Sequence, residues 1–177
     1  RGVTNPMSIT IPGIANNKVN ASATGLKRRQ GSSYTMNPGK GREVTITASG
    51  TTAEGTKVGP FSTKFRIKDI PRPSGSMSKQ TGSLKLPRKN VEIATVGAAL
   101  EDFDFDLNLK VSGFKFKVPG QPTVSVSGSK LNGQAKSALK RAKRGDAVQI
   151  FDVSAYITNN KGYKLKKVSP VVVEITN

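Results

Sequence analysis

The sequence contains no cysteine, no histidine and no tryptophan among its 177 residues. Without cysteine, the chain cannot form a disulfide and has no thiolate to act as a nucleophile or a soft metal ligand. Without histidine, it lacks the side chain that most often serves as a general base near neutral pH. We therefore expect no catalytic residues, no cofactor and no metal site, and we predict that the protein is not an enzyme. A serine and lysine pair in an unrecognised frame is the alternative that stays open.

Long apolar runs are also missing, because no stretch approaches the roughly 20 residues of a membrane-spanning helix. The chain begins at Arg1 without a methionine or a signal-peptide pattern. We expect it to be a fragment of a longer polypeptide, with any membrane anchor in the missing part.

Acidic side chains are scarce, since 29 Lys and Arg face 11 Asp and Glu, which gives a formal net charge of +18. The excess is +9 in residues 1–75 and +9 in residues 76–177, so there is no separate basic tail. Such a surplus attracts polyanions, and binding to nucleic acid or acidic glycan is our second hypothesis. The alternative is a role in solubility alone. Because the aromatic residues mostly occupy core positions of the apolar pattern, few remain for stacking on bases, and we do not expect nucleic acid as a partner.

The clearest pattern is an alternation of apolar and polar residues between Leu100 and Val118. Its apolar positions are Phe103, Phe105, Leu107, Leu109 and Val111, and after Gly113 the parity changes to Phe114, Phe116 and Val118. A period of two predicts a strand with one buried face, and a glycine at the phase change predicts a bulge. A strand of this kind needs a second layer, as in an antiparallel sandwich.

Shorter alternating runs predict further strands throughout the chain. In the first half they are 7–11, 19–23, 34–36, 44–48 and 61–67, with a basic loop at 26–31; in the second half they are 84–86, 91–96, 124–126, 148–156 and 171–175. Turns recur about every ten residues, as in immunoglobulin-like domains. The fold we predict is mainly β, with two tandem antiparallel β-sandwich domains.

Two prolines and several glycines and serines interrupt the strand pattern between Ile70 and Ser83. Such a break marks a domain boundary. We therefore predict an immunoglobulin-like sandwich at 1–72, a linker at 73–83 and a C-terminal sandwich at 84–177.

One segment, at about 130–144, shows helical spacing. Its apolar stripe consists of Leu131, Ala135, Ala138, Leu139 and Ala142. Ser127 or Ser129 is the expected N-cap, Gly145 is the expected stop, and basic residues crowd the last turn, where the helix dipole favours cations. The second domain thus carries one helix in this prediction, and the basic side of that helix is either a binding patch or a solvated face.

Two possible sites have less support. The GKG segment at 39–41 lacks the frame of a phosphate-binding loop and precedes a strand. The acidic side chains Glu101, Asp102, Asp104 and Asp106 have the chemistry of calcium ligands, but strand alternation favours a solvated face instead.

Several strings resemble the GldM/PorM family, the dimeric, inner-membrane-anchored subunits of the gliding and type IX secretion motor. They are LEDFDFDL at 100–107, KRAKRG at 140–145 followed by Phe151 and Asp152, SITIPGI at 8–14 and FRIKDIP at 65–71. The resemblance covers nearly the whole chain and corresponds to the last two periplasmic domains.

The resemblance implies a structural role in the periplasm. The family forms a shaft that couples a proton-driven inner-membrane partner to a ring of outer-membrane-associated lipoproteins of the PorK/PorN type. We accordingly expect a homodimer whose second domain contacts the ring, with the motor partner bound through the missing N-terminal part. Our candidate contact residues are Lys136, Lys140, Arg141, Arg144, Lys164 and Lys166.

Overall fold

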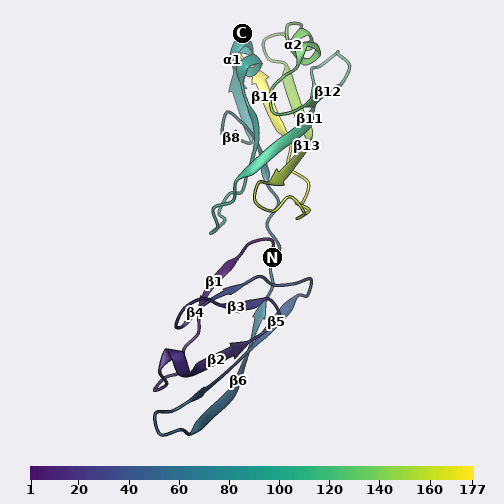
Figure 1. Ribbon diagram of the computed structural model, residues 1–177. Helices are drawn as coiled ribbons and strands as arrows, with labels where there is room; N and C mark the ends of the chain where they lie inside the picture. The colour runs from purple at the N-terminus through teal and green to yellow at the C-terminus, as the bar shows by residue number, and fades with distance from the viewer. The chain divides into compact units, whose positions relative to one another are not determined.

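A computed structural model describes residues 1–177, and the fold is mainly β, as predicted from the sequence. The chain forms two compact units, Arg1–Ile70 and Pro71–Asn177, which we describe separately (Figure 1). None of its helices combines the length and the apolar character needed to cross a membrane.

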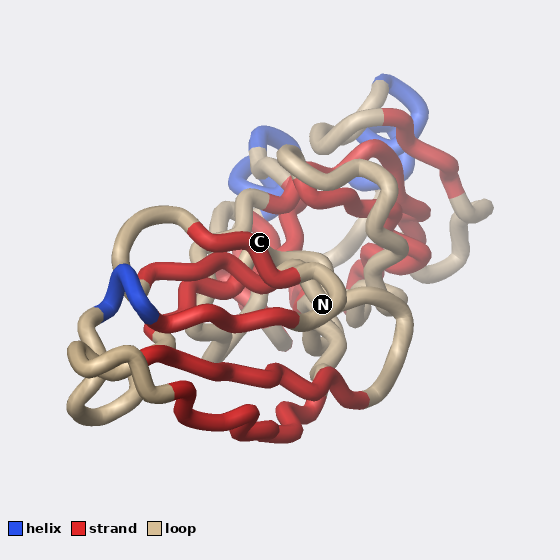
Figure 2. The backbone as a smooth tube through the Cα atoms, turned by 60° about the horizontal axis from the view of Figure 1, so that its bottom comes forward, coloured by secondary structure: helices blue, strands red, loops and turns tan.

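The first unit contains two three-stranded antiparallel sheets, with strand orders β1-β4-β3 and β2-β5-β6. Its elements are β1 (Asn5–Ser8), the 3-10 turn η1 (Asn16–Lys18), β2 (Val19–Ser22), β3 (Leu26–Arg28), β4 (Ser33–Met36), β5 (Glu43–Thr51) and β6 (Lys57–Arg66). Figure 2 shows these strands in two layers. The interior holds Ile11, Ile14, Val19, Tyr34, Met36 and Ile46. The segment 26–31, expected as a loop, instead begins with β3, which pairs with β4.

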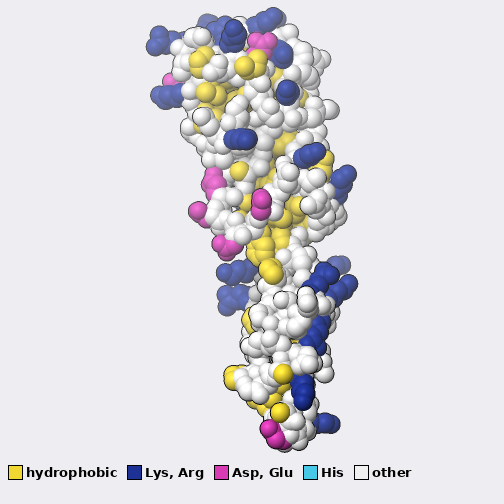
Figure 3. Space-filling view, turned by 60° about the vertical axis from the view of Figure 1, so that its left-hand side comes forward, with side chains coloured by type: hydrophobic (Ala, Val, Ile, Leu, Met, Phe, Trp, Pro, Cys, Tyr) yellow, Lys and Arg dark blue, Asp and Glu magenta, His cyan; other side chains and the backbone are white.

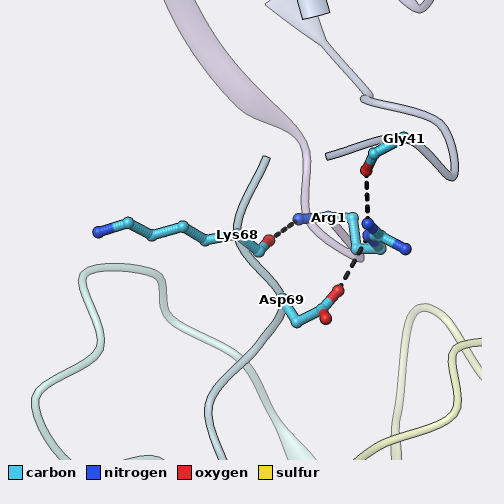
Figure 4. Close-up of polar contacts among 4 residues, drawn as sticks. All are labelled: Arg1, Gly41, Lys68 and Asp69. Carbon is cyan, nitrogen blue, oxygen red and sulfur yellow. Dashed lines mark hydrogen bonds and ion pairs between the residues drawn. The ribbon is translucent and has the colours of Figure 1, made fainter. Parts of the chain in front are cut away.

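Arg1 links the beginning of the first unit to its end (Figure 4). Its Nε lies 2.9 Å from Oδ1 of Asp69, and its Nη2 donates a 2.6 Å hydrogen bond to the carbonyl of Gly41. The α-amino group donates to the carbonyl of Lys68. These contacts hold the segment after β6 against the start of the chain.

The second unit contains a five-stranded sheet of order β12-β11-β13-β14-β9 and a three-stranded sheet of order β10-β7-β8. Its elements are β7 (Ser74–Met77), β8 (Gln80–Thr81), β9 (Ser83–Leu86), α1 (Arg88–Ile93), β10 (Val96–Ala99), β11 (Leu109–Lys117), β12 (Val124–Ser127), α2 (Gly133–Leu139), β13 (Ala147–Ile157) and β14 (Val171–Ile175). All pairings are antiparallel except that of β14 with β9, which is parallel. The two helices lie at one end of this unit (Figure 1).

The core of the second unit lies between its sheets and under its helices. Fully buried side chains come from both sheets, with Met77 and Val96 on one and Phe116, Ile150 and Val173 on the other. The predicted helical stripe, from Leu131 to Ala142, belongs to the same core. This core is larger than that of the first unit and includes residues of both helices.

The strand predicted around Phe103 begins later than expected, at Leu109. Residues 101–108 form turns and bends without a ladder, although their apolar side chains are still half-buried and their acidic ones exposed. In this segment, the alternation of apolar and polar residues therefore predicted which side chains are buried, but it did not predict strand pairing. The bulge predicted near Gly113 is confirmed, because the pairing with β13 shifts on both sides of Gly113 and the buried parity passes to Phe114 and Phe116.

The segment 73–83, predicted as a linker, belongs to the second unit and contains β7 and β8. Gly75 explains the difference. Its N–H donates to the carbonyl of Ser169 at 3.1 Å, and a Cβ at this position would lie 2.4 Å from that oxygen. The small residues that resemble a linker in sequence allow close backbone approach in a packed sheet.

The predicted helix is present but shorter, since α2 spans Gly133–Leu139 and tighter turns continue to Gly145. Its cap is Asn132, whose side chain accepts a 2.9 Å hydrogen bond from Ala135 N, and neither Ser127 nor Ser129. The sequence prediction missed the other helix, α1, and assigned part of it to a strand at 91–96. Its N-cap is Pro87, whose carbonyl accepts hydrogen bonds from Asn90 N at 2.9 Å and Val91 N at 3.2 Å.

Candidate functional site

Four of the predicted contact residues lie on or just after α2, and we call Lys136, Lys140, Arg141 and Arg144 the helix cluster. Because the apolar stripe of α2 packs into the core, these cations remain on the outer side. Lys140 and Arg144 are exposed and form no ion pair. The cluster is therefore a cationic surface with two free charges.

The other two cations of the helix cluster have partners. Lys136 Nζ lies 3.8 Å from Oε1 of Glu92 on α1, and Arg141 Nη1 donates a 3.0 Å hydrogen bond to Oε1 of Gln121. An exposed pair at this distance contributes little to stability. Arg141 also lines a shallow cavity of about 530 Å³ between α2 and the segment around Pro122. The solvent-facing side of α2 is thus cationic and borders a shallow cavity.

Lys164 and Lys166, which we call the loop cluster, lie on the connection between β13 and β14. This connection folds back along the second half of β13, and together they line a cavity of about 410 Å³ that includes Tyr156 and Tyr163. Lys161 also lies here, with its Nζ 5.7 Å from the centre of the Tyr156 ring. Both lysines of the loop cluster are exposed at the rim.

The structure does not bring the six predicted residues into one patch. The helix cluster precedes the start of β13 and the loop cluster follows its end, and β13 is 11 residues long. Because the loop cluster folds back beside residues 153–156, only the first half of β13 separates the clusters, which at about 3.3 Å per residue is roughly 20 Å. Figure 3 shows Lys and Arg side chains gathered at the end of the second unit that bears α1 and α2. The candidate site is therefore two separate basic surfaces.

Sequence reasoning missed an ion pair at the bulge between β11 and β13. Lys115 Nζ lies 2.8 Å from Oδ2 of Asp152 and 6.0 Å from the centre of the Phe151 ring. The hydrogen bond and the charge of Lys115 lower the pKa of Asp152, and Lys167 adds to this effect. Asp152 has a φ of 49°, which is typical of a bulged position. Sequence could not reveal the pair because it depends on the register of two strands.

Asp152 also lines a second cavity, of about 430 Å³, beside the one at the loop cluster. Its lining also includes Arg72, Phe151, Lys167 and Pro170. Arg72 Nε donates a 2.8 Å hydrogen bond to the carbonyl of Lys167, which fixes this part of the connection.

The other surface that sequence reasoning missed lies on β6. Phe61 and Phe65, expected in the core, are 53% and 40% exposed. The signal that could have identified an edge strand is Pro60, because proline within a strand is found at sheet edges.

The acidic segment 101–106 is exposed at its four carboxylates, while Phe103 and Phe105 stack at 5.4 Å between ring centres. No group of three or more acidic residues is close enough to hold a metal ion.

Comparison with protein families assigns both units. Residues 1–68 match the family described as the GldM third domain, and residues 71–176 match the GldM C-terminal domain. The search of curated proteins gave no match. Among solved structures, chicken VE-cadherin EC1-2 aligns with 99% of this chain and 92% of its own, at 13% identity and a TM-score of 0.27, which is too low to support an argument.

Proposed function

Because the chain belongs to the GldM family of gliding motility and type IX secretion, we propose that it is a structural and interaction module of a periplasm-spanning shaft. The shaft would couple a proton-driven motor in the inner membrane to a lipoprotein ring associated with the outer membrane. Members of the family are inner-membrane-anchored proteins with periplasmic domains, and we place both units of this chain in the periplasm.

The observation that best supports a docking role is the helix cluster. The apolar face of α2 is buried in the core, so only its polar face is available to a partner. The turns that follow α2 carry the unpaired cations Lys140 and Arg144, and Arg141 between them lines the adjacent cavity. Charge complementarity of this kind steers association and selects partners. The surface suits an acidic region on a ring component.

The proposal includes a homodimer and a motor partner bound by the N-terminal part of the whole protein. Neither the dimer contact nor the motor partner requires a catalytic residue in these two units. A shaft needs only packed cores that are rigid enough to transmit mechanical load. The large core of the second unit, with Phe116, Ile150 and Val173 fully buried, provides the rigidity that this role needs.

The test is a pull-down of purified ring lipoproteins by the full chain and by two charge-reversal variants. Lys140→Glu with Arg144→Glu changes the helix cluster, and Lys164→Glu with Lys166→Glu changes the loop cluster by the same total charge. We expect the first variant to lose binding by about tenfold or more and the second to retain it. Unchanged binding by a folded helix-cluster variant would remove this surface from the proposal.

The second candidate is polyanion binding, favoured by the net charge of +18 and by two basic clusters rather than one. Here both variants would lose affinity equally, because the interaction follows total charge. A fluorescence titration with single- and double-stranded DNA and with heparin, in rising salt, separates the two candidates. Absence of binding at low salt would exclude this alternative.

A further inference from the structure

Strand β6 is the outermost strand of the sheet β2-β5-β6 and pairs only with β5. It is 10 residues long, and all but one of them are exposed. Its second edge therefore presents unpaired backbone N–H and C=O groups to solvent. A long free edge of this kind is a template for another strand.

The apolar side chains of β6 point to the side of the sheet on which the core lies. Phe61 pairs with Ala48, and Phe65 pairs with Val44. Between them, Thr63 pairs with Ile46, which is 5% exposed. Residues that pair directly across a ladder share a face. Both phenylalanines are exposed although they lie on the core side of the sheet.

The other face of β6 is basic. Lys64 and Arg66 alternate with the phenylalanines, Lys57 lies at the start of the strand, and the strand contains no acidic residue. None of these three cations forms an ion pair, although Glu43 on β5 lies opposite Arg66. One face of β6 thus carries two exposed phenylalanines, and the other face carries cations that form no ion pair.

Lysine and proline on an edge strand are also known means of preventing aggregation. They explain Lys57 and Pro60, but they do not explain two exposed phenylalanines beyond the proline. Cations repel a second copy of the same edge, because like charges on paired strands are destabilising. They do not repel an acidic strand.

We propose that the free edge of β6 at residues 61–66 binds an extended segment of another polypeptide in which apolar and acidic side chains alternate. The segment would add a strand to the sheet through backbone hydrogen bonds. Its apolar side chains would cover Phe61 and Phe65, and its carboxylates would pair with Lys64 and Arg66. This site lies in the first unit and does not depend on the helix cluster or on the proposed function.

The test uses the full chain and a synthetic peptide of alternating valine and glutamate. We expect amide NMR shifts on titration to concentrate in β6, and Lys64→Glu with Arg66→Glu to weaken binding on the order of tenfold. Phe61→Ser with Phe65→Ser should weaken it similarly. Lys27→Glu with Arg29→Glu is the matched control, since both residues are exposed in the first unit outside β6; it changes the net charge equally and should leave the affinity within about twofold.

Three results of the titration would overturn the proposal. They are shifts outside β6, equal affinity for a peptide with lysine in place of glutamate, and an equal loss in the control variant. Association of the chain with itself through β6, abolished by the phenylalanine substitutions, would also overturn it by assigning the edge to a second copy. If the phenylalanine variant fails to fold by circular dichroism, the charge variant and its control still decide.

Discussion

At the residue scale, the pairing of Lys115 with Asp152 shows how a register shift creates an interaction between distant positions. The bulge places both side chains on one face, at an N–O distance of 2.8 Å. Because the pKa of Asp152 is lowered in the folded state, its contribution to stability is present above the unfolded pKa of about 3.9 and is lost as the pH falls through the folded pKa.

Replacing the lysine tests this account. In Lys115→Met we expect the pKa of Asp152 to rise towards its ordinary value, because the hydrogen bond and the nearby positive charge are both removed. The measurement is an NMR titration of the side-chain carboxyl carbon through the acid range. Lys110→Met, on the same strand, is the control, and an equal shift there would show that the effect comes from general charge.

The burial of individual residues can be predicted only in part from the sequence. Phe114 and Phe116 occupy the buried positions that their parity predicts, whereas Phe61 and Phe65 follow an equally good alternation and are exposed. The difference is whether a second layer covers the strand, which an alternation of side chains does not report.

At the element scale, α2 illustrates which helix signals are local. Its apolar stripe was predicted from spacing, but its first turn was placed too early and its end too late, since α2 ends at Leu139 and not before Gly145. Asn132 is the cap because its side chain accepts from Ala135 N and its amide group donates to the carbonyl of Ser125 on β12. The second contact fixes the helix start and depends on the neighbouring strand.

Removal of the cap should weaken α2. We expect Asn132→Ala to lower the free energy of unfolding by about 1 kcal/mol, since Ala135 N loses its partner. Ser129→Ala should change it by no more than about 0.5 kcal/mol. Urea unfolding followed by circular dichroism measures both, and an equal cost in the two variants would contradict the assignment of the cap.

Two sequence predictions, a strand that includes 103–108 and a linker at 73–83, failed for element-scale reasons. The segment 103–108 alternates but does not pair, and 73–83 looks like a linker but pairs through β7 with β10. Strand formation requires a partner with free hydrogen-bonding groups, whereas turn-rich composition only shows that small residues are present.

At the scale of the whole molecule, the chain has two cores that share no element. Ile46 is buried in the first unit and Phe116 in the second. We infer that a cavity in one core leaves the stability of the other unchanged, because mutational effects at distant sites without shared partners are independent.

Two truncations test this independence. Phe116→Ala should destabilise the second unit by about 3–5 kcal/mol, and Ile46→Ala should destabilise the first by about 2–5 kcal/mol. Amide hydrogen exchange, followed peptide by peptide, reports each unit separately. Loss of protection in both units from either substitution would indicate a single cooperative body.

The sequence by itself determined the β class, the presence of two domains, the family and the helical stripe of α2. Each depends on local periodicity or on strings of adjacent residues. Only the tertiary structure decided which strands pair, that Asp152 meets Lys115, that the six candidate cations form two clusters and that β6 keeps a free edge. These features depend on register and on coverage by a second layer, which arise from contacts between residues far apart in the chain.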